Sequence, residues 1–237
     1  LDETMEQLIL GPNVTAPAGY DQNPMFEPID RAMALPAGRG VGNSLDDIYA
    51  LGVNIILLSL GYNPAEKMTE EELLEARLNV GSYTAITGNV KLPMRLIEPL
   101  RGMLADNPHE RWDLIEINNW LTGQKFTPTK RKPQSKSSTY FKFIGKDFSS
   151  PRVLALYFSQ NPKDAAEAIK SDAFGTWLNR GLKQPEKFNS INGILQNTKF
   201  YADSYQGTDE YLTARVSAIL DPSGPIRYKG LAFMLDG

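Results

Sequence analysis

The stretch DDIYALGVNIILLSLGYNP, residues 46–64, decides how this chain of 237 residues is expected to fold. An acidic pair precedes an almost unbroken apolar run, which is shorter than the roughly 20 residues needed to span a bilayer. The pattern therefore predicts a helix inside a protein core, covered by other elements on every face. Ser44, Asp46 and Asp47 supply N-cap oxygens and negative charge at its start. Gly61 and Pro64 are expected to end it.

Composition excludes several classes of protein. With 41% hydrophobic and 22% charged residues, the chain has the make-up of an ordinary globular protein. A net charge of -3 argues against a nucleic-acid partner. The lack of cysteine excludes disulfides and thiolate metal sites and favours a reducing, cytoplasmic compartment. A single histidine, His109, leaves no histidine cluster for zinc, and we expect no cofactor, no metal ion and no membrane partner.

Periodicity divides the chain into two mainly α-helical parts joined by a basic segment. The first part, residues 1–123, is expected to hold a short strand at QLILG and then helices. Residues 124–148 are rich in Lys, Pro, Ser and Thr, and we favour a solvated linker with one short strand over a nucleic-acid or phosphate-binding arm. Residues 149–237 are expected to form a small helical domain.

Local signals place the helices within these parts. Capping residues and Pro at first helical turns mark their starts. Near the C-terminus, Asp221, Arg227 and Tyr228 crowd a Gly- and Pro-rich turn, for which we favour an Asp–Arg bond over a binding site. The expected helices lie in MTEEELLEARLNVG, PMRLIEPLRGMLAD, NPHERWDLIEINNWLTG, SSPRVLALYFSQ, NPKDAAEAIKSDAFGTWLNRGL and DEYLTARVSAILDP.

The segment DIYALG resembles the protein kinase motif Asp-x-Trp/Tyr-Ser/Ala-x-Gly, which begins the long central helix of the kinase C-terminal lobe. Asp47, Tyr49 and Gly52 match the motif position by position. The resemblance implies that this aspartate caps the backbone of a catalytic loop and that the helix is the apolar post of the lobe.

A second segment, LRGMLADNPHERW, resembles the kinase pattern Leu-x-x-Asp-Pro-x-x-Arg. Leu104, Pro108 and Arg111 match it, while Asn107 stands where aspartate is usual. In kinases this arginine pairs with the glutamate that ends the activation segment. Glu27 in FEPIDRAM is the corresponding acid here, so the resemblance implies a buried ion pair between Glu27 and Arg111.

The resemblance covers residues 7–122 and corresponds to the C-terminal lobe alone. Phosphoryl transfer needs a glycine-rich loop, a phosphate-binding lysine, a catalytic aspartate and a metal-binding Asp-Phe-Gly. If LILGPNV leads into that last motif, Ile9, Leu10 and Gly11 occupy its place, and isoleucine cannot hold Mg²⁺. No catalytic residue is therefore expected in this chain.

The segment GRGVG, residues 38–42, has the look of a phosphate-cradling loop, with Arg39 as an anion clamp. It has neither the P-loop lysine nor a preceding strand, so we favour a turn within the activation segment. The anion site at Arg39 is the alternative.

These features predict an inactive kinase-like (pseudokinase) module of bacterial type that works through protein contacts. Its expected partners are a missing N-terminal lobe, another copy of the chain or a different protein. One alternative is the C-terminal part of an active serine/threonine kinase. A second is a helical peptide-binding adaptor unrelated to kinases, which an amphipathic central helix would favour.

Overall fold

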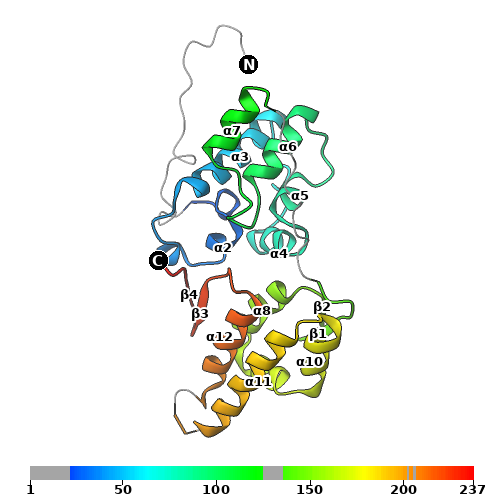
Figure 1. Cartoon of the computed structure of the whole chain (residues 1–237), viewed down its shortest axis with the longest axis vertical. Helices are drawn as coiled ribbons and strands as arrows, with labels where there is room; N and C mark the ends of the chain where they lie inside the picture. Colours follow the sequence, from blue (N-terminus) through cyan, green and yellow to red (C-terminus); the bar gives the residue numbers. More distant parts are fainter. Residues whose placement is uncertain (1–21, 125–135, 202, 205–206) are drawn as a thin grey trace.

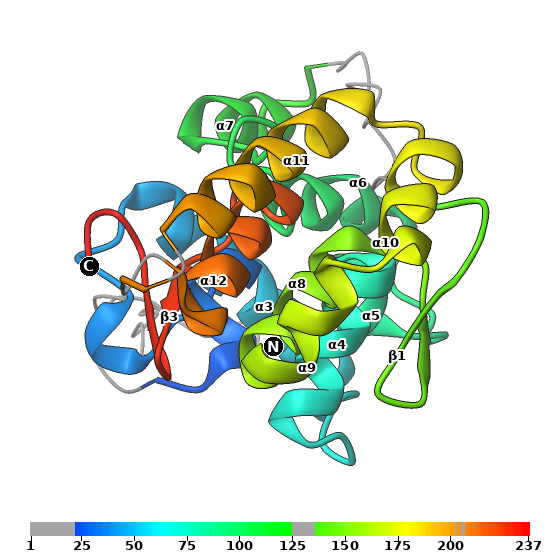
Figure 2. The ribbon, with the colours of Figure 1, turned by 90° about the horizontal axis from the view of Figure 1, so that it is seen from below.

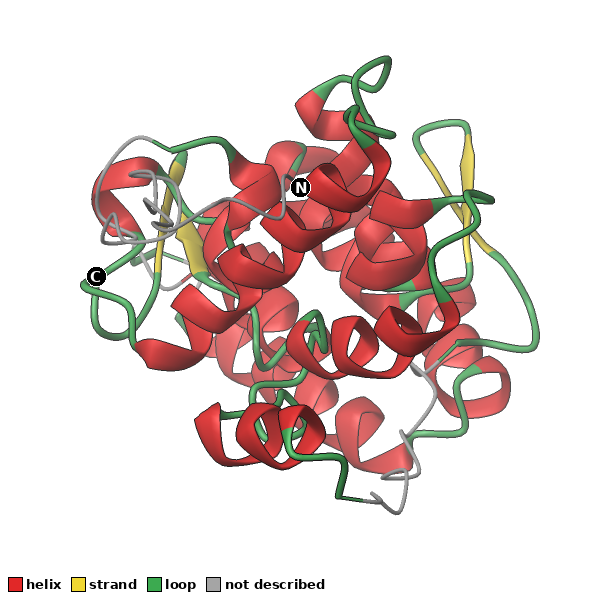
Figure 3. Cartoon of the chain, turned by 90° about the horizontal axis from the view of Figure 1, so that it is seen from above, coloured by secondary structure: helices red, strands yellow, loops and turns green. Residues whose placement is uncertain are grey.

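The computed structural model describes residues 22–124, 136–201, 203–204 and 207–237. The strand expected at residues 7–11, and with it the proposed counterpart of the metal-binding motif, lies outside the described residues. The described chain is mainly helical, as expected, with two small hairpins on opposite sides of the helices (Figure 3).

The helices form two bodies stacked along the longest axis of the molecule (Figure 1). We call residues 22–124 the N-terminal body and residues 136–237 the C-terminal body. The elements of the N-terminal body, in chain order, are η1 (Pro24–Phe26), α2 (Ile29–Ala32), η2 (Pro36–Gly38), α3 (Ser44–Leu60), α4 (Glu70–Val80), α5 (Ser82–Thr87), α6 (Met94–Met103) and α7 (Leu114–Leu121).

Helix α3 is the apolar helix that the opening stretch predicts, but its start and its surroundings differ from expectation. Asn43, not Ser44, is the N-cap, and the side chain of Asp46 completes a capping box by accepting from the Asn43 N–H. Gly61 ends the helix with a φ of 73°. The helix is not covered on every face, because Leu58 is 79% exposed.

The other helices of the N-terminal body follow their local signals closely. The Thr69 side chain caps α4 and forms a capping box with Glu72, as the sequence indicates. Helices α6 and α7 lie where periodicity predicts them, and α6 packs against α3. The short helix α5 was not anticipated, because Gly81 and Gly88 enclose only six residues.

The C-terminal body is built from helices and two antiparallel hairpins. The first hairpin pairs Phe141 with Phe148, and the second pairs Ile226 with Phe233. The elements, in chain order, are β1 (Phe141–Phe143), β2 (Lys146–Phe148), α8 (Pro151–Gln160), α9 (Pro162–Ile169), α10 (Asp172–Thr176), the π-helical turn η3 (Trp177–Gly181), α11 (Pro185–Phe200), α12 (Asp209–Leu220), β3 (Ile226–Tyr228) and β4 (Leu231–Phe233).

Two expectations for this half need correction. Residues 141–148 fall in the expected linker, and its short strand is present as β1; this strand pairs with β2, however, and Phe141, Phe143 and Phe148 are buried in the core. The single helix expected at residues 161–182 breaks at Ser171, whose hydroxyl accepts from the Phe174 N–H and starts a new helix. The hairpin is buried because aromatic residues alternate along its strands. The helix breaks because a serine inside it acts as an N-cap.

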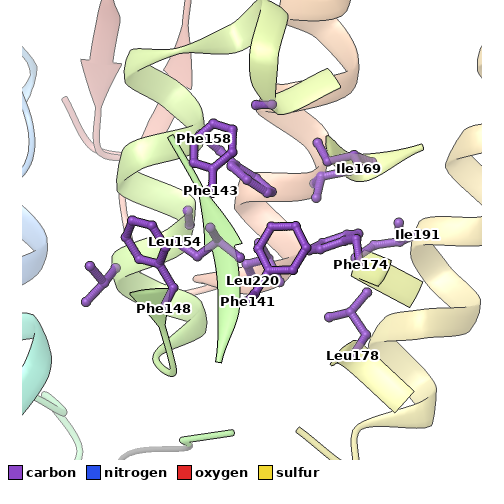
Figure 4. Packing of buried hydrophobic residues seen from close by; sticks show 14 of the residues in the cluster. Phe141, Phe143, Phe148, Leu154, Phe158, Ile169, Phe174, Leu178, Ile191 and Leu220 are labelled. Carbon is purple, nitrogen blue, oxygen red and sulfur yellow. The ribbon is translucent and has the colours of Figure 1, made fainter. Parts of the chain in front are cut away.

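An aromatic cluster fills the C-terminal body (Figure 4). Phe158 on α8 is fully buried, and its ring lies 4.9 Å from that of Phe143 and 5.7 Å from that of Phe174. Helix α12 packs along α8, α9 and α11 to close this core. Figure 2 shows α12 beside α8, with the β1 and β3 hairpins at opposite edges of the molecule.

The two bodies contact each other through apolar and polar groups. Ile29, Met33 and Leu78 of the N-terminal body belong to the same hydrophobic cluster as the core of the C-terminal body. At the edge of this contact the Tyr157 hydroxyl donates to Glu75 at 2.6 Å. The described residues therefore form two cores joined by a packed interface.

Candidate functional site

Tyr49 and Gly52, two of the kinase-like residues, lie on the buried side of α3. Tyr49 is fully buried. A Cβ at position 52 would lie 3.0 Å from the Cβ of Met103, so glycine permits the close packing of α3 on α6. Both residues therefore contribute to the packing of the N-terminal body.

Two guanidinium groups flank the ring of Tyr49. The Cζ atoms of Arg77 and Arg111 each lie 5.5 Å from the ring centroid. Arg77 also donates to the Tyr49 hydroxyl at 2.8 Å. Burial raises the pKa of the Tyr49 hydroxyl, while the charge of Arg77 opposes that shift.

Arg77 was not singled out from the sequence, yet it connects three segments. Besides Tyr49, it donates to the carbonyl oxygens of Pro24 at 2.8 Å and Glu27 at 2.6 Å and to the hydroxyl of Ser82 at 3.0 Å. The spacing of the sequence could have indicated that Arg77 is buried. Arg77 follows Leu73 by four residues, about one helical turn, and therefore lies on the same buried face of α4.

The predicted ion pair between Glu27 and Arg111 is wrong. Both residues are buried, at 1% and 5% exposure, but no ion pair joins them among the described residues. Arg111 instead donates to Asp46 at 3.2 Å and to the carbonyl oxygen of Ala105 at 3.0 Å. The Glu27 carboxylate accepts from the side chain of Gln22. Burial raises the pKa of Glu27, and this hydrogen bond and the charge of Arg39 oppose the rise.

Asp46, rather than the motif residue Asp47, carries the contacts at the start of α3. Its carboxylate accepts from Arg31 Nε at 2.8 Å and from Arg111 Nη1 at 3.2 Å. Asp47 is exposed, and burial followed by the neighbouring charge of Asp46 raises its pKa. Asp46 therefore links α2, α3 and the turn that carries Arg111.

The GRGVG segment packs against the C-terminal end of the chain. The Met234 N–H donates to the Gly38 carbonyl at 2.8 Å, and the Leu35 N–H donates to the Ala232 carbonyl at 2.9 Å. A Cβ at Gly38 would lie 2.6 Å from the Ala232 oxygen. Gly40 has a φ of 77°, and a Cβ there would lie 2.8 Å from the Asp236 carboxylate. The glycines thus make room for a polypeptide segment.

Arg39, the candidate anion clamp, is 3% exposed and faces the protein interior. Its Nη1 donates to the carbonyl oxygen of Gln22 at 3.0 Å, and its own carbonyl oxygen accepts from Arg31. Arg31 extends to the C-terminal segment and pairs with Asp236 at 3.0 Å. In this segment it is Arg31, not Arg39, that holds a carboxylate.

A second charged cluster lies in the C-terminal body, around the turn that follows α12. The Asp221 carboxylate is fully buried, and it pairs with Arg152 at 2.8 Å and with Arg227 at 3.6 Å. The predicted Asp–Arg bond is therefore confirmed. Lys187 donates to the Leu220 carbonyl nearby at 3.0 Å. Burial lowers the pKa of Lys187 and of Arg227, Asp221 opposes both shifts, and Arg152 adds to them.

A cleft of about 770 Å³, open to solvent, lies between the two bodies, and we call it the interbody cleft. One wall comes from the end of α4, from α5 and from the turn after α6. The other comes from Lys136, Arg152 on α8, and Ser223 in the turn after α12. Its lining residues are Asn79, Val80, Gly81, Ser82, Tyr83, Thr84, Arg101, Leu104, Ala105, Asp106, Asn107, Pro108, Glu110, Lys136, Arg152 and Ser223.

Among the residues that the structure describes, those lining the cleft have an excess of positive charge, with three cations, Arg101, Lys136 and Arg152, against the two acids Asp106 and Glu110. Both acids accept local hydrogen bonds. Asp106 accepts from the Ser82 N–H at 3.2 Å, and Glu110 accepts from the side chain of Asn107 at 3.1 Å. The sequence did not indicate this cleft, because its walls come from segments that are separate in the chain, residues 79–110 on one side and positions 136, 152 and 223 on the other.

Within the described ranges, no group of three or more acidic or histidine side chains is arranged to hold a metal ion. None of the helices in those ranges is long and apolar enough to cross a membrane. His109 is exposed in the turn before Arg111, as expected. Comparison with protein-family models, with curated proteins and with solved structures finds no match to this chain.

Proposed function

We propose that this chain is a catalytically inactive, kinase-like module that binds a segment of a partner protein in the interbody cleft. The observation that carries the proposal is the cleft itself. Its volume of about 770 Å³ lies within the roughly 300–1,000 Å³ of typical ligand sites. Its mixed polar and charged lining suits a polypeptide, which offers both backbone groups and side chains.

The roles of the kinase-like residues support a structural rather than a chemical use of the motif. Arg111 is committed to Asp46 and to a backbone carbonyl, and Tyr49 is enclosed by two arginines. Both side chains are buried and hold helices together. We further propose a cytoplasmic location, since a chain without cysteine suits a reducing compartment.

Peptide display tests the proposed cleft. We expect peptides selected on the purified chain to lose binding when Thr84, exposed on the cleft wall, is replaced in Thr84→Trp. The matched control is Ser190→Trp on an exposed face of α11, which should leave binding unchanged. Equal binding by the wild type and both variants would rule out the cleft as the interaction site.

Calorimetry with Mg-ATP separates this proposal from the active-kinase alternative. We expect no saturable heat at millimolar nucleotide. Saturable binding in the micromolar range would contradict an inactive module and favour the catalytic alternative.

A second candidate, a helical adaptor unrelated to kinases, is favoured by the exposure pattern of α3. The side chains of Ile48, Val53 and Ile56 are buried, whereas Leu58 is exposed. Helix α3 therefore has one buried face, and the exposed apolar side chain of Leu58 is open to a partner. If Leu58→Arg abolishes the binding of selected peptides and Thr84→Trp does not, the peptides bind at α3 rather than in the interbody cleft. That result would favour the adaptor function.

A further inference from the structure

We propose that the interbody cleft recognises a phosphorylated segment of its partner protein, with the phosphate held by Arg101, Lys136 and Arg152. The inference rests on the proposed function and specifies the chemistry of the partner. It follows from the placement of charge in the cleft and in the buried cluster behind it.

The three cations come from separate parts of the chain and meet in one cavity. Arg101 lies on α6, and its Cζ lies 5.2 Å from the centroid of the Tyr83 ring. Lys136 precedes the β1 hairpin and is exposed, and Arg152 lies on α8. A guanidinium fork and an ammonium group suit a phosphate, which offers three acceptor oxygens and a charge of about -2.

Arg152 is oriented for this role by Asp221. Its Nε donates to the buried carboxylate at 2.8 Å, and its side chain keeps 17% exposure. The remaining donors of Arg152 are therefore free to turn toward the cleft that it lines. The exposed residue Ser223 lines the cleft beside Asp221, and its hydroxyl donates to that carboxylate at 3.5 Å.

Charge balance behind the cleft wall also favours an added anion. In the described part of the chain, Arg152, Arg227 and Lys187 lie around one carboxylate, that of Asp221, so three cations face one anion. Arg227 is 7% exposed, and none of the described groups accepts a hydrogen bond from its Nε. A dianion beside Arg152 would offset this excess where water is partly excluded.

A phosphate on a polypeptide fits better than a free ion. Phosphate alone would fill a small part of the roughly 770 Å³ cleft, leaving the partly exposed Tyr83 and Pro108 without a ligand contact. A peptide on either side of the phosphorylated residue would cover these groups. Because the walls belong to both bodies, the bound segment would also tie the bodies together.

The test uses the full chain and two pairs of charge variants. The first pair, Arg101→Gln with Lys136→Gln, removes two exposed cations from the cleft and leaves the Arg152–Asp221 contact intact. The matched control, Arg95→Gln with Lys142→Gln, removes two exposed cations from the same segments outside the cleft. Both double variants change the net charge equally, which separates local recognition from general attraction.

Orthophosphate is the first probe, titrated at constant ionic strength and followed by the amide signals of residues 81–84 and 223. We expect saturable shifts in the wild type, at least tenfold weaker binding in the cleft variant and less than twofold change in the control. Equal weakening in both variants, or linear shifts without saturation, would overturn the proposal.

Peptides obtained by display, synthesised with and without phosphoserine, are the second probe. We expect phosphorylation to strengthen binding at least tenfold, orthophosphate to compete, and the cleft variant to abolish the difference. If peptides bind in a Thr84→Trp-sensitive manner but phosphoserine and the cleft cations have no effect, the proposed function stands and this inference fails. Binding of orthophosphate, of single-stranded nucleic acid or of anionic lipid vesicles, combined with failure of every phosphopeptide, overturns it as well.

Discussion

In the C-terminal body Phe158 lies among the rings of Phe141, Phe143 and Phe174, whereas in the N-terminal body the ring of Tyr49 lies close to the guanidinium groups of two arginines. Both arrangements exclude water around a large side chain. Apolar contacts have no preferred direction and depend on the area and volume that are filled. Neighbouring side chains can therefore repack when one of them changes. Buried guanidinium groups require acceptors at fixed positions, so each one ties its segments in a single arrangement.

The two bodies are therefore expected to tolerate different kinds of substitution. A buried charge that loses its partner keeps its desolvation cost, whereas a buried ring that is shortened leaves a cavity that its surroundings partly fill. The C-terminal body is therefore expected to respond to lost volume, and the N-terminal body to lost acceptors and to pH. The following variants test that contrast, starting with the largest expected effect.

Phe158→Ala should destabilise the protein by about 3–5 kcal/mol, because it removes a fully buried ring from the aromatic cluster. Urea unfolding monitored by circular dichroism measures the change. Phe200→Ala is the matched control, since the same substitution removes a ring that is 84% exposed. Equal losses in the two variants would show that the aromatic cluster does not dominate this body.

Arg111→Met should lower the free energy of unfolding by about 2–3 kcal/mol, because hydrogen bonds that involve charged groups contribute roughly 1.5–3 kcal/mol. The loss comes from the contacts to Asp46 and to the Ala105 carbonyl.

A double-mutant cycle sharpens this result. Arg111→Met and Asp46→Asn together should cost clearly less than the sum of the single changes, whereas Arg111→Met and Glu27→Gln should be additive. Coupling to Glu27 and not to Asp46 would restore the pairing that the kinase resemblance implied.

Glu27→Gln should have a smaller effect, visible as a change in pH dependence. Burial raises the pKa of Glu27 above its usual 4.5, so the folded chain binds more protons than the unfolded chain just above pH 4.5. Wild-type stability should therefore fall, relative to Glu27→Gln, as pH rises from 4.5 through the folded pKa. Unfolding free energies measured across this range check the sign, and the exposed control Glu71→Gln should follow the wild type.

Asp236→Asn should have the smallest effect, below about 1 kcal/mol, because its side chain is 45% exposed and its pair with Arg31 is screened by solvent. Hydrogen exchange should nevertheless become faster at the Leu35 and Met234 amides, which hold the C-terminal segment to residues 35–38. The control Asp147→Asn, exposed on β2, should leave these amides unchanged. Unaltered exchange in Asp236→Asn would show that the backbone pairs suffice.

Much of the secondary structure could be predicted from the sequence, because its signals are local. Thr69 caps α4 three residues before Glu72, Pro151 opens α8, and Gly61 ends α3 in the left-handed conformation. Each of these effects depends on atoms within one helical turn. The mainly helical class and the contact between Asp221 and Arg227 followed from the same kind of evidence.

The tertiary structure alone decided which charges meet. The sequence marked Arg111 and Glu27 as important but could not show that Asp46, 65 residues away along the chain, is the partner of Arg111. It also could not show that glycines 38 and 40 receive the C-terminal segment, or that Arg101 and Arg152 face one cleft. Electrostatic and hydrogen-bond partners are chosen by distance in space, and only the packing of the two bodies sets those distances.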